Sequence, residues 1–560
     1  MLNYKRYKRV PVVNFPERTW PDKQIEKAPI WCSVDLRDGN QALIEPMNVD
    51  EKMEMFDLLL RLGFKEIEIG FPAASQIEYD FLRKLVAENK IPDDVKVQVL
   101  TQCRQELVDR TFEAIQGIKN VVVHIYNSTS TLQRDVVFNK SQDEIIDIAI
   151  AGTRMVKEHL ADFDGNVQLE YSPESFTGTE VDFALRICTA VQKEWDHATD
   201  APIIFNLPAT VEMNTPNVYA DQIEWMSTHF EDRDNIILSV HPHNDRGTGV
   251  AITELALLAG ADRVEGTLLG NGERTGNVDI LTVAYNMFSQ GINPELEIED
   301  VKEIVEIYER CCKMHVDMRH PYAGKLVFTA FSGSHQDAIN KGVHAMQERG
   351  NEYWEVPYLP IDPADIGRKY EPVVRINSQC GKGGVAFVMD TVYGYKLPKK
   401  MQREFADVIQ YISEQEGGEV EPQKMMEAFK KEYFENKMPF ELVFVDIDDN
   451  MANDETHVSL DFKYNGKAIH SEADGNGPID AVKLAVKQCV PQVDFSVLDY
   501  SEHSLGKGSG AKAAAYIEMR DNRSGNITFG VGVSSNITRA SIRGMFSAMN
   551  RLAKKANDYV

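Results

Sequence analysis

The chain has 560 residues, of which 43% are hydrophobic and 26% charged, and its formal net charge is −27 at pH 7. A chain of this length exceeds one compact core, so we expect a large domain with one or two smaller ones. The negative charge disfavours nucleic acid and anionic membranes as partners, because the long-range field of the protein repels both.

The sequence lacks the usual signals of membrane insertion or secretion. Its longest apolar runs, such as residues 255–261, are far shorter than a bilayer span, and the basic N-terminus has no apolar stretch like that of a signal peptide. The seven cysteines include no CxxC pair, which is typical of reduced, mostly buried thiols. We therefore expect a cytoplasmic protein.

From residue 30 the chain repeats one pattern: a short apolar run rich in β-branched residues, then a longer amphipathic stretch with apolar residues at helical spacing. Alternating strands and helices predict a parallel sheet, and eight such units in roughly 250 residues match a (β/α)₈ TIM barrel. A doubly wound open sheet is the alternative, although no GxGxxG turn follows the first strand. The expected strands are 30–36, 66–71, 95–101, 121–126, 167–171, 202–207, 236–241 and 263–268.

After the expected barrel the strand signal fades, and residues 291–437 are typical of small helical linker subdomains, with the clearest helices expected at 402–415 and 423–435. From 438 onward two similar halves follow each other, which indicates an internal duplication in an α+β domain. We therefore predict domains at 1–290, 291–437 and 438–560. Each half should hold three strands and a helix, at 441–447, 457–464, 467–472 and from 477, and at 495–503, 511–520, 526–534 and 536–554.

Two histidines end the seventh expected strand. In HPHND at 241–245, His241 and His243 are two residues apart, so both imidazoles point to the same side of a strand. An isolated HxH pair is weak evidence, because solvated or core histidines often have this spacing. Its position strengthens it, since the active sites of TIM barrels lie at the C-terminal ends of the strands.

The first strand ends in a second polar motif, DLRDGNQ at 35–41. In a closed barrel this strand neighbours the eighth and lies close to the seventh, so Asp38 can join His241 and His243. Two imidazoles, a carboxylate and free positions are typical of a catalytic divalent-metal site, and Mg²⁺, Mn²⁺ and Zn²⁺ all suit it. By itself, Asp38 would be explained by a turn-stabilising Asp-Gly pair.

The other strands also end in polar or glycine-rich segments. The last strand leads into GNGERTGN at 270–277, whose glycines allow close approach of the backbone to an anionic ligand, unless the segment is simply a long loop. An apolar barrel interior has no use for many polar groups on one rim, so we predict a substrate pocket there. The polar residues that end strands four to six are His124, Tyr126, Glu174, Asn206 and Thr210.

Three motifs, LRDGNQ at 36–41, HPHND at 241–245 and GNGERTGN at 270–277, resemble those of the 2-isopropylmalate synthase family, a group within the metal-dependent Claisen-condensing barrel enzymes. The resemblance covers essentially the whole chain, including the segment around His335 and the C-terminal duplication. It implies an acyltransferase that condenses acetyl-CoA with 3-methyl-2-oxobutanoate and water to give 2-isopropylmalate and CoA. This is the first committed step of leucine biosynthesis.

The resemblance also implies residue roles. Arg37 matches the cation beside the ketone oxygen, Glu174 a group near the reacting centre, and His335 the base that deprotonates the acetyl methyl group, although a solvated helix histidine would explain His335 equally. The matching metal ligands are Asp38, His241 and His243, with Asn277 near the ion. Gly272 and Arg274 are assigned to acetyl-CoA. The keto-acid pocket matches Leu100, His124, Ser172, Asn206 and Thr210.

The C-terminal domain resembles the family's leucine-binding domain, which implies feedback inhibition by leucine, a homodimer, and potassium as an activator. A turn at 475–481 leads into a helix whose N–H groups and dipole can receive an amino-acid carboxylate, and 504–510 is its counterpart. Glycine turns between strands and helices would look the same. The regulatory residues implied are Gly475, Gly477, Pro478, Ala481, Gly508 and Gly510.

Three alternatives stay open at this point. Homocitrate and citramalate synthases run the same chemistry on another 2-oxo acid, and one methylene is worth only about 1–3 kcal/mol in such a pocket. A TIM-barrel metal hydrolase also uses an HxH pair, but typically on its first strand. A non-catalytic leucine sensor would have no use for an intact Arg37, Asp38, His241 and His243.

Overall fold

The computed structural model describes residues 12–330, 333–350, 352–370, 382–416, 420–450, 455–506 and 510–557. They divide into two compact units. One comprises the chain up to Phe328 together with Ile361–Lys369, and the other comprises Thr329–Pro360 and the chain from Tyr370. Within the described ranges, no helix has the length and apolar character needed to cross a membrane.

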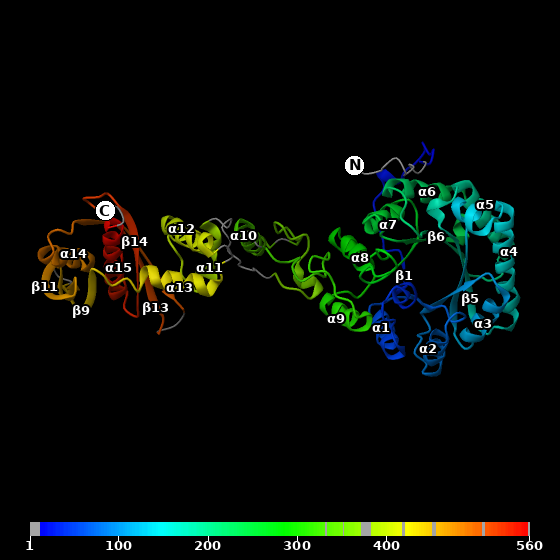
Figure 1. The fold of residues 1–560 in the computed structure, drawn as a ribbon, viewed down its shortest axis with the longest axis horizontal. Helices are drawn as coiled ribbons and strands as arrows, with labels where there is room; N and C mark the ends of the chain where they lie inside the picture. Colours follow the sequence, from blue (N-terminus) through cyan, green and yellow to red (C-terminus); the bar gives the residue numbers. More distant parts are fainter. Residues whose placement is uncertain are drawn as a thin grey trace. The chain divides into compact units, whose positions relative to one another are not determined.

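The first unit is a closed barrel of eight parallel strands in sequence order, with β8 hydrogen-bonded to β1, and this confirms the predicted TIM barrel. Figure 1 shows the strands inside a ring of helices. The strands are β1 (Ile30–Ser33), β2 (Glu66–Gly70), β3 (Lys96–Gln102), β4 (Asn120–Ser128), β5 (Asn166–Glu174), β6 (Ile203–Ala209), β7 (Ile236–Pro242) and β8 (Arg263–Gly266). The helices are α1 (Val49–Arg61), α2 (Gln76–Ala87), α3 (Gln105–Ile115), α4 (Gln142–His159), α5 (Val181–Trp195), α6 (Pro216–His229), α7 (Gly249–Leu258) and α8 (Ile280–Ser289).

The first barrel helix illustrates why these segments fold as they do. Asn48 caps α1 by accepting hydrogen bonds from the backbone N–H groups of residues 50 and 51, and the Glu51 carboxylate accepts a hydrogen bond from the Asn48 N–H. Its apolar residues recur at helical spacing and are buried against the barrel, among them Met55, Phe56 and Leu59. Capping and the apolar stripe together determine where the helix begins and which face it buries.

The first and last barrel strands end earlier than the sequence pattern indicates. The strand expected at 30–36 stops at Ser33, because Asp35 accepts hydrogen bonds from the Ser33 hydroxyl (2.8 Å) and the Leu268 N–H (3.2 Å) and starts a helical turn at 35–39. The strand expected at 263–268 stops at Gly266, where a Cβ atom would lie 2.6 Å from Val278. Arg37 and Asp38 therefore project from a helical turn at the mouth of the barrel.

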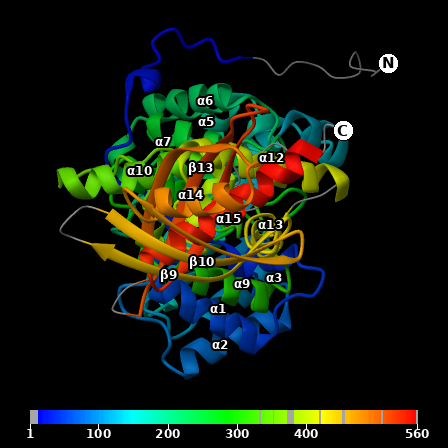
Figure 2. The ribbon, with the colours of Figure 1, turned by 90° about the vertical axis from the view of Figure 1, so that its left-hand side faces the viewer.

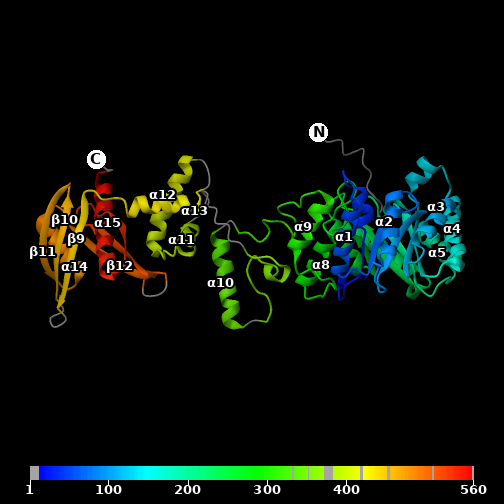
Figure 3. The same ribbon diagram turned by 90° about the horizontal axis from the view of Figure 1, so that it is seen from below.

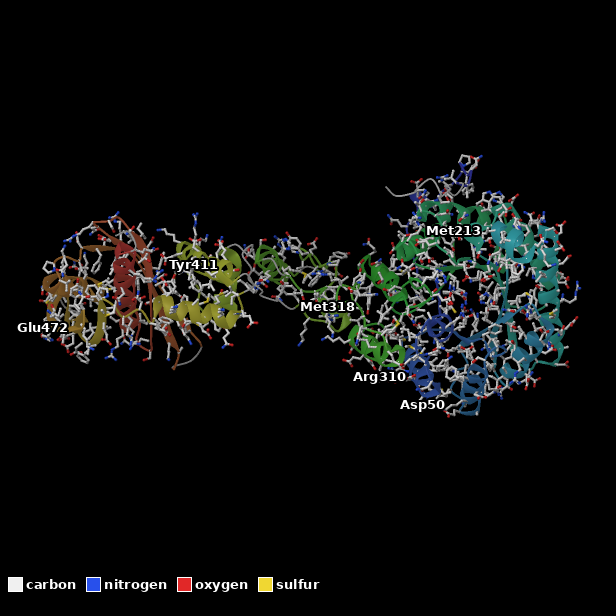
Figure 4. The ribbon with its side chains drawn as sticks, viewed as in Figure 1. Asp50, Met213, Arg310, Met318, Tyr411 and Glu472 are labelled. Carbon is white, nitrogen blue, oxygen red and sulfur yellow. The ribbon has the colours of Figure 1, made fainter. Side chains whose placement is uncertain are left out.

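Helices follow the barrel. In the first unit α9 (Val301–Cys312) packs against α1, and Arg310, labelled in Figure 4, pairs with Glu54 at 3.2 Å. The second unit contains α10 (Gly333–Arg349), α11 (Lys382–Thr391), α12 (Lys399–Glu416) and α13 (Pro422–Tyr433). The helices expected at 402–415 and 423–435 correspond to α12 and α13. The predicted domain boundaries at 290 and 437 stay predictions.

Two antiparallel sheets, each followed by a helix, end the described chain, as the predicted duplication requires. The helices and strands of both halves share one core, to which Val458, Val482, Ile517 and Met545 contribute. In Figure 2 the red helix α15 runs along the strands, and Figure 3 shows α14 beside β10 and β11. The elements are β9 (Phe440–Asn450), β10 (Glu455–Tyr464), β11 (Lys467–Gly475), α14 (Pro478–Cys489), β12 (Phe495–Leu505), β13 (Lys512–Asp521), β14 (Ile527–Ser534) and α15 (Ile537–Asn557).

Candidate active site

A cavity of about 380 Å³ lies at the C-terminal ends of the barrel strands. This is the end at which TIM-barrel active sites are built, from side chains that distant parts of the sequence contribute. Most of the residues singled out in the sequence line it, namely Arg37, Asp38, Leu100, His124, Ser172, Glu174, Asn206, Thr210, His241, His243 and Arg274.

Asp38, His241 and His243 form a buried triad in this cavity. The Asp38 Oδ2 atom lies 3.2 Å from His241 Nε2 and 3.5 Å from His243 Nε2. Donor atoms that share one cation through bonds of roughly 2.1 Å are about 3.0–3.4 Å apart, so the spacing fits a divalent ion.

One further atom beside the triad, Asn277 Oδ1, supports a cation site. Among the described residues, His243 Nδ1 and Asn277 Oδ1 are buried and have no hydrogen-bond partner. Asn277 pairs with His243 through an isolated β-bridge, and its amide nitrogen donates to the Asn271 carbonyl (3.1 Å), which leaves Oδ1 free. A buried polar atom without a partner is costly, and a bound cation or its water would remove the cost at Asn277.

The charges of the triad and its neighbours shift one another's pKa values. Burial raises the pKa of Asp38, but the Arg37 guanidinium and the hydrogen bond from His241 outweigh it and hold that pKa well below its ordinary value. Burial lowers the pKa of His241, yet hydrogen bonds to Asp38 and Glu265 raise it to about 9. Burial and the adjacent His241 lower the pKa of His243 to about 4, so His243 is neutral at pH 7.

Two carboxylates hold Arg37 in a fixed orientation. Its Nε donates to Glu68 Oε2 (2.7 Å) and its Nη1 contacts Asp38 Oδ1 (3.1 Å). Burial lowers the pKa of Arg37, but Glu68 and Asp38 raise it above its ordinary value, so the guanidinium is permanently charged. From α1, the buried Lys52 donates to the Leu36 carbonyl (3.2 Å) and so supports the turn that carries Arg37.

A polar wall of the cavity is built from β4, β5 and β6. His124 Nε2 lies 2.7 Å from Ser172 Oγ, and Asn206 Nδ2 donates to the same oxygen (3.1 Å). The Glu174 carboxylate accepts a hydrogen bond from the Ser128 hydroxyl. Leu100 adds an apolar surface to this wall.

The loop after β8 brings Arg274 and Gly272 to the rim. Arg274 lines the cavity, where its Nε donates to Asp245 Oδ1 (2.6 Å). A Cβ atom on Gly272 would lie 2.4 Å from the Asn277 amide, so glycine is needed for the loop to pack on Asn277. The assignment of Gly272 and Arg274 to acetyl-CoA stays a prediction.

His335 belongs to the second unit rather than to the barrel. It lies on α10, where its ring stacks on Tyr358 with the centroids 4.1 Å apart. Its predicted role as a base stays a prediction.

The C-terminal domain has a cavity of its own, of about 680 Å³, at the start of α14. Of the residues implied as regulatory, Gly477 and Pro478 line it. Gly475 packs directly against Ala481, where a Cβ atom on the glycine would lie 2.5 Å from the Ala481 nitrogen. Gly510 has open space around it, and Gly508 lies outside the described residues.

Sequence reasoning missed the charged layer beneath the cavity. Glu68, Arg263 and Glu265 are fully buried inside the barrel, and Glu66 nearly so. The signal was present: β2 and β8 carry charges at alternate positions, and alternate residues of a barrel strand face the interior. His124, Glu170 and Glu265 form a second cluster of potential ligands, but Arg263 already lies 3.0 Å from Glu265 and 3.4 Å from Glu170.

Fold and site together define a class: a (β/α)₈ barrel with a carboxylate-imidazole cation site at its C-terminal mouth, followed by a duplicated α+β domain. Residues 28–307 match the family described as HMGL-like. Residues 325–390 match the alpha-isopropylmalate synthase post-catalytic domain-like family, and residues 419–553 match the LeuA allosteric (dimerisation) domain.

Full-length relatives identify the family within this class. The 2-isopropylmalate synthase of Clostridium acetobutylicum is 54% identical, over 98% of this chain and 99% of its own length. That of Agrobacterium fabrum is 52% identical, over 98% of both chains. The chain belongs to the 2-isopropylmalate synthase family. A solved HMG-CoA lyase from Brucella melitensis is 16% identical over 51% of this chain and all of its own, with a TM-score of 0.42, too slight a likeness to support a conclusion.

Proposed function

We propose that this chain is an acyltransferase that condenses acetyl-CoA with 3-methyl-2-oxobutanoate and water to give (2S)-2-isopropylmalate and CoA, the first committed step of leucine biosynthesis. The observation that carries the proposal is the buried triad of Asp38, His241 and His243, which opens into a cavity at the catalytic end of the barrel. Identity of more than half to synthases over nearly the whole chain supports the same reaction.

The donor set fits a divalent cation held by Asp38, His241 and His243, with Asn277 beside it. Such an ion would supply a Lewis acid and a template for the carboxylate and ketone oxygens of the 2-oxo acid. Mg²⁺, Mn²⁺ and Zn²⁺ all suit two imidazoles and a carboxylate. Potassium, as an activator, would bind outside this donor set.

Arg37 would stabilise the charge that develops on the ketone oxygen as the new bond forms. Its guanidinium is fixed by Glu68 and Asp38 before the substrate arrives, so little reorganisation is needed during the reaction. A rigid planar fork with a permanent charge suits this task better than a flexible ammonium group.

The wall formed by Leu100, His124, Ser172, Asn206 and Thr210 would hold the keto acid. Its polar groups suit the carboxylate, and the Leu100 side chain suits the isopropyl group. The negative net charge of the protein repels the carboxylate of the substrate, so the pocket must supply positive groups of its own.

The reaction needs a base, and we assign that role to His335. The base takes a proton from the acetyl methyl carbon, whose electron pair then forms the bond to the ketone carbon. The ketone π-electrons move to oxygen, which takes up a proton to become the hydroxyl of the product. Water then hydrolyses the thioester and releases the CoA thiol. Glu174, oriented by Ser128, would support the charge distribution next to the reacting carbon.

We further propose that leucine binds in the cavity at the start of α14 and inhibits a cytoplasmic homodimer. The helix N-terminus beside Gly477 and Pro478 favours a carboxylate, Asp480 favours an ammonium group, and Ile479 and Val497 provide an apolar surface. The match of this region to the LeuA allosteric (dimerisation) domain supports both regulation and pairing.

The reaction is tested by following release of the CoA thiol from acetyl-CoA with a panel of 2-oxo acids. We expect 3-methyl-2-oxobutanoate to give the highest kcat/KM. A higher kcat/KM with pyruvate or 2-oxoglutarate would replace the assignment by a citramalate or homocitrate synthase. Turnover and metal content that survive in both D38A and H241A would overturn the site itself.

A further inference from the structure

Glu265, at the end of β8, is fully buried beneath the cavity and contacts the proposed cation ligand His241. We propose that Glu265 is a positioning residue, which orients His241 toward the cation and fixes the Asn206 amide in the wall of the keto-acid pocket. The inference rests on the cation site proposed above and concerns a residue that touches neither ion nor substrate.

Four donors surround the Glu265 carboxylate. Oε2 accepts hydrogen bonds from His241 Nδ1 (2.8 Å) and Asn206 Nδ2 (3.1 Å). Oε1 accepts them from Gln98 Nε2 (2.7 Å) and Arg263 Nη1 (3.0 Å). Because each oxygen accepts two hydrogen bonds, the carboxylate cannot rotate without breaking several of them in the buried interior.

The Glu265 carboxylate determines which nitrogen of His241 faces the cation. An ionised carboxylate only accepts, so His241 Nδ1 keeps its proton against Glu265, and a bound cation would take the place of the proton that Nε2 donates to Asp38. Nε2 is the atom 3.2 Å from Asp38 Oδ2, on the side of the cation site. His243 differs, because its Nδ1 is buried and has no hydrogen-bond partner in the part of the chain that the structure describes. Glu265 thus orients the His241 imidazole through the ring nitrogen that does not face the cation, as carboxylates often do in metal sites.

Glu265 also determines how the Asn206 amide is turned. The two N–H bonds of Asn206 point to Glu265 (3.1 Å) and to Ser172 Oγ (3.1 Å). Its Oδ1 is buried and, among the described residues, unpartnered, so this acceptor can take a donor such as a bound water or the hydroxyl of the product. Ser172 in turn contacts His124, so one chain of hydrogen bonds joins the cation site to the keto-acid wall.

Glutamine at this position has nearly the same shape but cannot meet the same partners. If its amide oxygen faced His241 and Asn206, its NH₂ group would face the donors of Gln98 and Arg263. In the opposite orientation the NH₂ group would face the donors of His241 and Asn206. Either orientation loses two hydrogen bonds, so E265Q separates the acceptor role from the volume of the side chain.

The test measures Mn²⁺ binding to metal-stripped full-length protein by calorimetry, with Mn²⁺ as the probe. We expect E265Q to bind Mn²⁺ about 10- to 100-fold more weakly than the wild type. The matched control is E66Q, because Glu66 is also buried and accepts from the same Arg263 (2.6 Å), whereas His241 hydrogen-bonds Glu265 and Asp38 instead. E66Q should bind Mn²⁺ like the wild type.

The outcomes separate the inference from the proposed function. Wild-type protein that binds no Mn²⁺ would overturn the cation site itself. Equal affinity in E265Q and wild type, or equal losses in E265Q and E66Q, would overturn the positioning role alone. A raised KM for the keto acid in E265Q, absent from E66Q, is the expected second result.

If E265Q does not fold, wild-type protein labelled with ¹⁵N-histidine answers the question without a variant. In the Zn²⁺-loaded state we expect the spectrum of His241 to show the proton on Nδ1 and the metal on Nε2. A proton on Nε2 would overturn the inference.

Discussion

Replacement of Arg37 by lysine keeps the charge of the residue and removes the planar guanidinium with its several N–H donors. In the wild type, Nε contacts Glu68 (2.7 Å) and Nη1 contacts Asp38 (3.1 Å), so the group is held at two points. A lysine ammonium has a single nitrogen on a flexible stem and cannot reproduce this planar, two-point geometry. The variant R37K therefore tests geometry rather than net charge.

The expected losses follow from these contacts. A charge-assisted hydrogen bond contributes about 1.5–3 kcal/mol to folding stability, and R37K loses one of two. Misplacing a group that stabilises the developing oxyanion costs about 2.7–4 kcal/mol, which corresponds to a 10²- to 10³-fold lower kcat. Because the charge beside Asp38 remains, the metal affinity of R37K should stay close to that of the wild type.

The assay compares R37K with R134K for kcat, KM, Mn²⁺ affinity and thermal unfolding. Arg134 is also a buried arginine that forks onto a carboxylate, Glu180, at 2.7 and 2.9 Å, but it does not line the cavity. R134K should lose some stability and keep its kcat. A wild-type kcat in R37K, or equal falls in kcat for both variants, would refute the reasoning.

Three further predictions follow from the structure. Removal of divalent ions with EDTA should abolish thiol release, and added Mg²⁺, Mn²⁺ or Zn²⁺ should restore it; turnover in fully stripped protein would contradict the cation site. In G475A the new Cβ would lie 2.5 Å from the Ala481 nitrogen, so we expect weaker leucine inhibition with an unchanged kcat in its absence, as read from a leucine dose–response curve. In the wild type, the Arg551 guanidinium holds the pKa of Glu404 below the ordinary 4.5, although burial acts in the opposite direction. R551M removes one partner of this buried pair, which should lower the free energy of unfolding by about 3–5 kcal/mol at neutral pH. The stabilisation by this pair is present above pH 4.5 and is lost as the pH falls through the lower folded-state pKa of Glu404. Denaturation curves should therefore show that the difference in unfolding free energy between wild type and R551M shrinks in acid. A difference that stays constant with pH would contradict this assignment.

Local patterns in the sequence were sufficient for much of the architecture. Alternating apolar runs and amphipathic stretches predict eight strand-helix units, and the two similar halves after residue 438 predict the two sheets with their helices. These features depend on neighbours within a few residues, because side-chain periodicity and capping act locally.

The residues of the proposed metal centre could also be predicted from the sequence, but only after the closed barrel had been predicted. Asp38 and His241 are 203 positions apart, and their side chains meet because β1 closes on β8, next to β7. Once a closed barrel is assumed, the polar ends of its strands must share one rim.

Tertiary structure alone decided what surrounds those residues. Asp35 ends β1 at Ser33 through a contact with Leu268, and Glu265 gains its four donors from β3, β6, β7 and β8. No window of sequence contains these partners together, since Gln98, Asn206 and His241 reach Glu265 only when the sheet closes and water leaves its interior. There an unpaired charge is costly, so the identity and direction of every partner determine which nitrogen of His241 faces the proposed cation site.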